Sequence, residues 1–201
     1  KKLLNYIKIN KLVVRLIHLG SVSVYGAEKK YCNKIFNITE SSTLSSYDLY
    51  SKSKIESDLL IQNYSRKNNN DFSFTILRIA NVFSNSNNPK SFRLINYLLT
   101  RGIWFNCSNN TNYHFIHAKD IALAALLCIL NFQKSKNKIY IVSDDINQLQ
   151  LHKVYAKKNK LKLFKIPVPL KLLELIIKNI PLPRIILNFL LTISSQVIYD
   201  N

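Results

Sequence analysis

Hydrophobic residues follow two patterns along the chain: short continuous runs, and longer stretches in which they recur every three or four residues. The continuous runs predict strands at residues 12–19, 72–79, 114–117 and 138–142, the first of them buried on both faces. The helical spacing predicts helices over residues 3–8, 47–67, 92–100, 120–132 and 149–158. Because strands alternate with helices, we expect an α/β fold of βαβ units around a parallel sheet.

The remaining segments are polar or interrupted. Residues 27–46 are predicted to be irregular, residues 81–89 to be a polar loop, and residues 167–198 to be helices broken by prolines. A membrane-spanning helix needs about 20 mostly apolar residues. Charged residues and prolines divide the apolar tract 166–198 into shorter pieces, so we expect no transmembrane segment. A monotopic surface anchor stays an alternative.

The net charge of the chain indicates which kinds of partner it could bind. The chain has 29 Lys and Arg residues against 11 Asp and Glu, a net charge of +18. Its lysines are mostly scattered singly, and the densest cluster, residues 157–162, is typical of the solvated end of a helix. Nucleic-acid-binding proteins more often concentrate basic residues in a stripe with interleaved aromatic side chains. We therefore expect no nucleic-acid partner, while an inactive basic module that binds a polyanion stays an alternative.

The number and spacing of the glycines argue against a glycine-rich nucleotide loop, and those of the cysteines argue against disulfides and metal sites. The only three glycines are Gly20, Gly26 and Gly102, and no glycine-rich nucleotide loop can be built from them. The three cysteines are widely spaced and form no C-x-x-C pair. We therefore expect neither a disulfide framework nor a metal site, and a reducing, cytoplasmic location fits this usage.

Tyr50 and Lys54 form the pair that suggests chemistry. They are four residues apart in a predicted helix, so they share one face, one turn apart. A lysine ammonium beside a phenol favours the phenolate, which can act as a general base. The Y-x-x-x-K spacing alone is common, and a surface tyrosine near a lysine would show it as well.

Ser21 gives this pair a context. It follows a predicted strand, and ligands of open α/β sheets bind at the carboxyl ends of the strands. A hydroxyl at this place can hydrogen-bond to a substrate oxygen near Tyr50. Ser23 is a competing candidate in the same loop, and its alternative role is a turn hydroxyl that bonds to its own backbone.

Several motifs, in order, resemble those of the extended short-chain dehydrogenase/reductases, in particular the nucleotide-sugar epimerase/dehydratase group that includes UDP-glucose 4-epimerase. The matching segments are Ser21-Val22-Ser23-Val24-Tyr25-Gly26, Glu40, Tyr50-Ser51-Lys52-Ser53-Lys54 followed by Glu56 (where the family has Y-x-x-S-K-x-x-x-E), Leu77-Arg78-Ile79-Ala80-Asn81-Val82-Phe83, Phe115-Ile116-His117-Ala118-Lys119-Asp120, Phe164-Lys165-Ile166-Pro167 and Tyr199-Asp200-Asn201. Together they cover nearly the whole chain.

The resemblance implies a role for each of these site residues. Tyr50 would be the general base, and Lys54 would assist it and hold the nicotinamide ribose of NAD, with NADP as an alternative. Ser21 and Ser23 would bind the sugar, and Asn81 would bind the diphosphate or sugar of a nucleotide-diphosphate sugar. The whole protein is expected to be a homodimer.

The resemblance also implies the organisation of the chain. The family's N-terminal Rossmann half, with its glycine-rich fingerprint, is not matched, so we expect a fragment that lacks the N-terminal part. The fold would be the C-terminal part of a Rossmann-like, doubly wound parallel sheet plus a smaller, mostly helical substrate-binding lobe. Residues 1–80 would form the remaining half of the NAD(P)-binding domain. Residues 81–201 would be mainly the sugar-nucleotide lobe, with returning Rossmann segments near 112–145.

Differences from the family's motifs restrict which of the family's reactions we expect. Dehydratases carry an acidic residue where this chain has Val22, which disfavours dehydration. Tyr113 stands where many members have an arginine that holds the nucleotide, and Ser84 where they have glycine. We expect epimerisation through a transient 4-keto intermediate, at C4 of a UDP-hexose or UDP-N-acetylhexosamine, in cell-surface polysaccharide biosynthesis. A nucleotide-sugar 4-ketoreductase or dehydrogenase is the alternative.

Other polar residues are expected to be structural. His18 lies inside the first predicted strand and is expected either to serve packing or to face outward. His117 ends a strand, and Asp120 is expected to cap the helix that follows. Asp144 and Asp145 are expected to form a turn.

Overall fold

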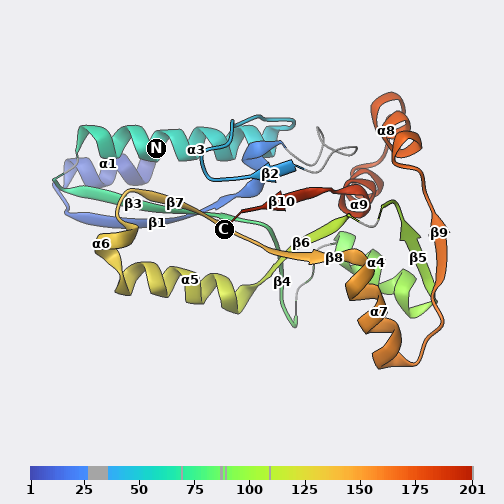
Figure 1. Cartoon of the computed structure of the whole chain (residues 1–201). Coiled ribbons are helices and arrows are strands. Elements are labelled where there is room, and N and C mark those ends of the chain that lie inside the picture. The colour runs from blue at the N-terminus through green and yellow to red at the C-terminus, as the bar shows by residue number, and fades with distance from the viewer. Residues whose placement is uncertain (27–35, 69, 87, 89, 109, 201) are drawn as a thin grey trace.

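A parallel three-stranded sheet forms the centre of the molecule (Figure 1). The computed structural model describes residues 1–26, 36–68, 70–86, 88, 90–108 and 110–200, so residues 27–35 of the predicted irregular segment, Pro89 and Asn201 lie outside the described residues. The strands are β1 (Val14–Ser21), β3 (Phe72–Ile79) and β7 (Lys138–Val142), in the order β1-β3-β7. Both pairings are parallel, which confirms the predicted α/β class.

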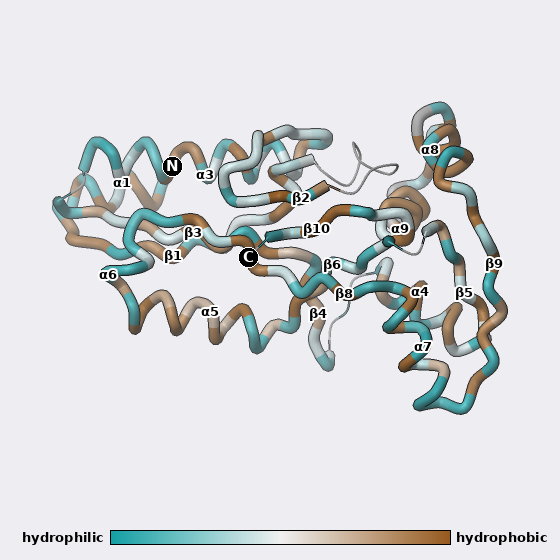
Figure 2. The backbone as a smooth tube through the Cα atoms, viewed as in Figure 1, coloured by the Kyte–Doolittle hydropathy of each residue, from teal (hydrophilic) through white to brown (hydrophobic). Residues whose placement is uncertain are grey.

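Helices cover both faces of this sheet (Figure 1). On one face lie α1 (Lys2–Ile9) and α3 (Leu49–Lys67), and on the other lies α5 (Ala118–Leu130), followed by the short α6 (Phe132–Ser135). The sheet and α5 share an apolar core that includes Leu77 and Ile121, and α1 contributes Leu4 to a second cluster. Figure 2 shows that apolar residues also occur along the rest of α5. Several of the leucines of this helix are exposed.

The two long strands differ in burial. All eight residues of β3 are buried, because it has a strand on each side and helices over both faces. The prediction that the first strand is buried on both faces is wrong: β1 begins only at Val14 and leaves Arg15 and Leu19 exposed. Among the described residues β1 pairs with β3 alone, so one edge of it is uncovered.

The remaining elements form a lobe at one end of the sheet (Figure 1). It contains the mixed sheet β4 (Asn81–Phe83), β6 (Asn112–His117) and β8 (Asp144–Asn147), and the parallel pair β5 (Ile103–Asn106) and β9 (Phe164–Pro167). Its helices are α4 (Lys90–Thr100), α7 (Gln148–Asn159), α8 (Leu170–Asn179) and α9 (Arg184–Ser194). Tyr113 and Phe189 belong to its core. The predictions of a loop from residue 81 and of a turn at Asp144 are wrong, because both segments begin short strands.

The end of the chain returns to the central sheet. It forms β10 (Val197–Tyr199), which pairs in parallel with β2 (Phe36–Ile38), so helices do not continue to residue 198 as predicted. Val197 and Tyr199 enter the same apolar core as Val22. Polar contacts hold this end: the His114 ring is hydrogen-bonded through Nδ1 to the Asp145 carboxylate and through Nε2 to the Ser195 hydroxyl, both at 2.8 Å.

Candidate active site

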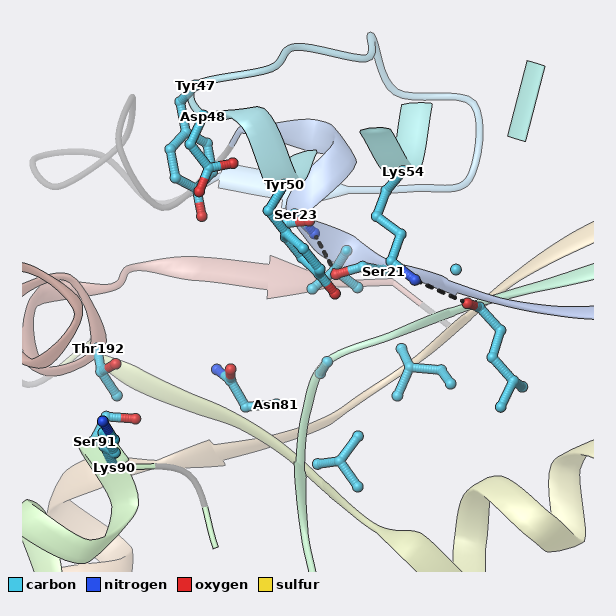
Figure 3. A pocket seen from close by; sticks show the side chains of 16 residues that line it. Ser21, Ser23, Tyr47, Asp48, Tyr50, Lys54, Asn81, Lys90, Ser91 and Thr192 are labelled. Atoms are coloured by element: carbon cyan, nitrogen blue, oxygen red, sulfur yellow. Dashed lines mark hydrogen bonds between the residues drawn. The ribbon is translucent and has the colours of Figure 1, made fainter. Parts of the chain in front are cut away.

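A cavity of about 800 Å³ opens where β1 and β3 end (Figure 3). Its wall includes Leu19 to Ser23 from β1 and the turn after it, and the first turns of α3. Asn81 and its neighbours after β3 form another part, and the beginning of α4 and one residue of α9 complete it. The cavity has the volume of a small-molecule site and lies at the carboxyl ends of parallel strands, where α/β sheets bind ligands.

Ser21 is the last residue of β1 and is buried beside the cavity. Its Oγ accepts a hydrogen bond from the backbone N of Ser23 at 3.2 Å, which caps the 3₁₀ turn η1 (Val22–Tyr25). Gly26 ends this turn at φ +60°, and a β-carbon there would lie 2.6 Å from the carbonyl oxygen of Ser45. Glycine therefore allows the chain to turn sharply after the strand and leaves Ser21 at the cavity wall.

A capping box fixes the start of α3. The Asp48 carboxylate accepts a hydrogen bond from the backbone N of Ser51 at 2.7 Å, and the Ser51 hydroxyl accepts one from the backbone N of Asp48 at 3.1 Å. The helix therefore begins at Leu49, two residues after the predicted start. Tyr50 lies in its first turn.

Tyr50 and Lys54 line the same cavity as Ser21 (Figure 3). Tyr50 is 48% exposed, and the Lys54 Nζ lies 5.6 Å from the centre of its ring. Lys54 donates a hydrogen bond to the carbonyl oxygen of Leu19 at 3.4 Å, which holds its ammonium beside the end of β1. The structure thus brings together the three residues that the sequence singled out as catalytic.

The two other predicted site residues, Asn81 and Ser23, also line the cavity. Asn81 follows the end of β3 and begins β4, and its amide projects between the two ends of the cavity (Figure 3). Ser23 has a buried Oγ with no hydrogen-bond partner among the described residues, so it is not the self-bonded turn hydroxyl of the alternative interpretation.

Sequence reasoning missed the far wall, which carries Lys90, Ser91 and Thr192 (Figure 3). Lys90 and Ser91 begin α4, and Thr192 lies on α9. Lys90 is exposed and makes no ion pair or hydrogen bond within the described part of the chain. An ammonium without a partner at a cavity wall can bind an anionic group. Only the tertiary contact between α4 and α9 assembles this wall.

Beneath the cavity lies a buried ion pair. Arg78 on β3 is 2% exposed, and its Nε donates to Oδ2 of Asp58 at 3.0 Å. Its NH1 donates to the Tyr25 hydroxyl at 2.7 Å and to the carbonyl oxygen of Glu40 at 3.1 Å. The sequence reading assigned the acidic position of the Tyr/Lys motif to Glu56, and this is wrong: Glu56 is exposed, whereas Asp58, four residues after Lys54, is buried.

Two further expectations, for Tyr113 and for the residue that caps α5, are corrected. Tyr113 lies away from the cavity, in the core of the lobe, where its hydroxyl is 3.1 Å from Nε2 of His152. Burial raises the pKa of this phenol. The side chain that caps α5 is His117, which accepts from the backbone N of Lys119, and Asp120 lies in the first turn.

Two classes of feature are not found. No helix in the described ranges is long and apolar enough to span a membrane. The described His, Cys, Asp and Glu residues form no group of three or more that could hold a metal ion.

Solved structures are similar to this chain at low sequence identity. A dTDP-glucose 4,6-dehydratase (DesIV) from Streptomyces venezuelae, solved with NAD bound, matches with a TM-score of 0.58 and 20% identity over 82% of this chain and 51% of its own. A UDP-glucuronic acid 4-epimerase from Bacillus cereus in complex with NAD matches with a TM-score of 0.62 and 16% identity over 83% and 54%. A UDP-glucose 4-epimerase from Thermotoga maritima, with UDP-glucose, matches with 0.59 and 17% over 83% and 54%.

These structures show that the fold is Rossmann-like, and this chain spans about half the length of each. No curated protein matches the sequence. The sequence model of the NAD dependent epimerase/dehydratase family matches residues 1–143, which is more than half of the chain. The protein therefore belongs to the NAD-dependent epimerase/dehydratase family.

Proposed function

We propose that this chain carries the acid–base residues of an enzyme that epimerises a nucleotide-diphosphate sugar through a transient 4-keto intermediate. The substrate would be a UDP-hexose or UDP-N-acetylhexosamine that reacts at C4. The observation that carries the proposal is the convergence of Ser21, Tyr50 and Lys54 on one cavity at the strand ends. Family membership and the nucleotide-sugar enzymes of similar fold support it.

In this proposal, Tyr50 and Ser21 act on the C4 hydroxyl of the sugar, Lys54 acts on Tyr50, and Asn81 and Lys90 bind the diphosphate. The Tyr50 phenolate accepts the proton of the C4 hydroxyl and returns it when the sugar is reduced again. The Lys54 ammonium favours the phenolate electrostatically. Ser21 hydrogen-bonds to the same hydroxyl and aligns it, and Asn81 and Lys90 bind the diphosphate further along the cavity.

NAD would accept the hydride and give it back. Tyr50 and Lys54 fit the nicotinamide end of this cofactor, because the ammonium lies at the cavity wall, where it can reach a ribose hydroxyl. The sequence has no glycine-rich loop for the cofactor's phosphates, so the proposal gives this chain the nicotinamide end alone. NADP in place of NAD, a homodimer, a cytoplasmic location, a role in polysaccharide biosynthesis and the division at residue 80 belong to the same proposal.

Val22 separates this proposal from a dehydratase. Elimination of water needs a further acid or base near the sugar. The residue after Ser21 is an apolar, buried valine, so it cannot supply that group. A 4-ketoreductase or dehydrogenase would use the same three residues, and product analysis distinguishes these reactions.

The experiment incubates the full-length protein with NAD and with UDP-glucose or UDP-N-acetylglucosamine and identifies the products by proton NMR. We expect the C4 epimer, and a loss of turnover of about 100-fold or more in Tyr50→Phe. Tyr97→Phe is the matched control, because Tyr97 is an exposed tyrosine on α4 that does not line the cavity. Unchanged turnover in Tyr50→Phe would remove this residue from its proposed role.

A binding experiment tests the alternative of a basic module. Thermal-shift titrations at about 0.15 M ionic strength compare UDP-sugar and NAD with RNA and anionic vesicles. Stabilisation by UDP-sugar supports the enzyme. Stabilisation by RNA or vesicles alone would favour the binding module, which the net charge of +18 motivates.

A further inference from the structure

Three consecutive residues of β1 contact α3 directly below the cavity. The His18 Nε2 lies 3.6 Å from Oδ1 of Asp58, and the Leu19 carbonyl accepts the hydrogen bond from Lys54. A β-carbon on Gly20 would lie 3.3 Å from the same Asp58 oxygen. Lys54 and Asp58 are one helical turn apart, so together they fix one face of α3 against the end of β1.

Asp58 is a rigid point of attachment. Its side chain is fully buried, and Arg78 holds Oδ2 at 3.0 Å. The guanidinium is itself tied to Tyr25 and to the backbone of Glu40, so the carboxylate is connected to β3, to η1 and to the loop before α3. The other oxygen, Oδ1, and the facing Nε2 of His18 are both buried without a hydrogen bond among the described residues.

Glycine at position 20 permits this close approach. A side chain there would meet Asp58 Oδ1 and Cγ2 of Ile76, both at 3.3 Å, which is closer than ordinary contact. The Asp58 carboxylate or the Ile76 methyl group would have to shift by a few tenths of an ångström to make room. The absence of a side chain at position 20 therefore leaves the Asp58 carboxylate in place against the end of β1.

We propose that Asp58 is a positioning residue: its Arg78-bound carboxylate holds the turn of α3 that carries Lys54 against Leu19, and its free oxygen is electrostatically coupled to His18 and to the Lys54 ammonium. The consequence for catalysis rests on the proposed function, whereas the coupling itself does not. Asp58 stands at the acidic position of the Tyr/Lys motif, and the proposal adds what its carboxylate does there and its link to His18.

The charged groups around His18 determine how the coupling changes its pKa. The charged groups that face it are Asp58 and Lys54 from α3, with Arg78 from β3 bound to the carboxylate. Burial lowers the pKa of His18, Asp58 raises it and Lys54 lowers it. Two variants on one helix should therefore shift this titration in opposite directions.

The test is a pH titration of the histidine carbon signals by NMR, with the His18 signal assigned from His18→Gln. Asp58→Asn should lower the pKa of His18, because the amide oxygen still accepts from Arg78 while the negative charge is removed. Lys54→Met should raise it. The matched controls are Asp71→Asn and Lys52→Met, which change exposed side chains and should leave the titration unchanged.

The outcomes separate the two proposals. Opposite shifts support the coupling of the Asp58 oxygen to His18 and Lys54, and a His18 titration that ignores either variant overturns it. Asp58→Glu, which keeps the charge, serves as a second variant if circular dichroism shows that Asp58→Asn is unfolded, and it should keep the His18 pKa nearer to the wild-type value. If no epimerisation is found for any variant, the proposed function fails while the titration still decides the role of Asp58.

An activity measurement extends the test to catalysis. In an active protein, Asp58→Ala, which removes the hydrogen bond to Arg78, should lower kcat by about 10- to 100-fold with little change in KM, because a displaced base misaligns the reaction without removing substrate contacts. Asp58→Asn, which keeps this hydrogen bond, should lower kcat less. A raised KM with an unchanged kcat in Asp58→Ala would contradict positioning of Tyr50 and Lys54.

Discussion

His152 is expected to make the stability of the lobe depend on pH. It lies on α7, is 1% exposed, and contacts the Tyr113 hydroxyl through Nε2 at 3.1 Å. Its Nδ1 is buried without a hydrogen-bond partner in the described ranges, and the Trp104 ring packs edge-on at 4.7 Å between ring centres. Burial without a nearby carboxylate lowers the pKa of His152 from 6.5 to about 4.

The size of the effect follows from this pKa. The unfolded chain binds a proton at His152 near pH 6.5, and the folded chain does so only near pH 4. Between these values the unfolded state binds more protons, so the free energy of unfolding falls as the pH is lowered. At about 1.4 kcal/mol per pH unit, the contribution of His152 is complete above pH 6.5 and is lower by about 3 kcal/mol at pH 4.

The assay is equilibrium urea unfolding at pH 7 and pH 4, for the wild type and for His152→Gln. Both proteins lose stability from carboxylates that titrate in the same range, so the informative quantity is the difference between their losses. We expect the wild type to lose about 3 kcal/mol more than the variant. Equal losses in the two proteins would show that His152 is solvated or paired, and would refute the reasoning.

Three other changes give direct tests. Gly26→Ala should lower the free energy of unfolding by about 2–3 kcal/mol in urea, because the φ of +60° and a β-carbon 2.6 Å from a carbonyl oxygen both disfavour a side chain, and a loss below about 0.5 kcal/mol would contradict this. Asp58→Ala should lower the free energy of unfolding by about 3–5 kcal/mol in the same assay, because it leaves the Arg78 guanidinium buried and unpaired. The double variant Asp58→Leu with Arg78→Met should lose less, because neither charge remains. A double variant less stable than Asp58→Ala would refute the argument. Lys90→Gln should weaken UDP binding by about 10-fold in calorimetry, and unchanged affinity would exclude a diphosphate contact at that wall.

The long elements could be predicted from the sequence because local pattern determines them. The apolar run that became β3 and the spacing that became α3 needed no knowledge of distant segments. The convergence of Ser21 with Tyr50 and Lys54 was also accessible, since the strand-end rule places loops and helix starts at the same edge of a parallel sheet.

The rest depends on contacts between distant segments. Strands β2 and β10 are three residues long, and each is defined by a partner at the other end of the sequence. The acidic position of the Tyr/Lys motif was assigned to Glu56, although Asp58 stands four residues after Lys54; the contact between α3 and β3 buries Asp58 against Arg78 and identifies it. Lys90 and Thr192 meet at the cavity only because α4 packs against α9.

The pairing of β2 with β10 has a consequence for how the molecule is assembled. Phe36 lies beside Val197, so this pair joins segments from opposite ends of the described chain. Pairings with such large sequence separation require a long loop to close, which slows folding. Because Val197 shares a core with Val22, directly after Ser21, the support of the turn beside the cavity depends on this slow pairing.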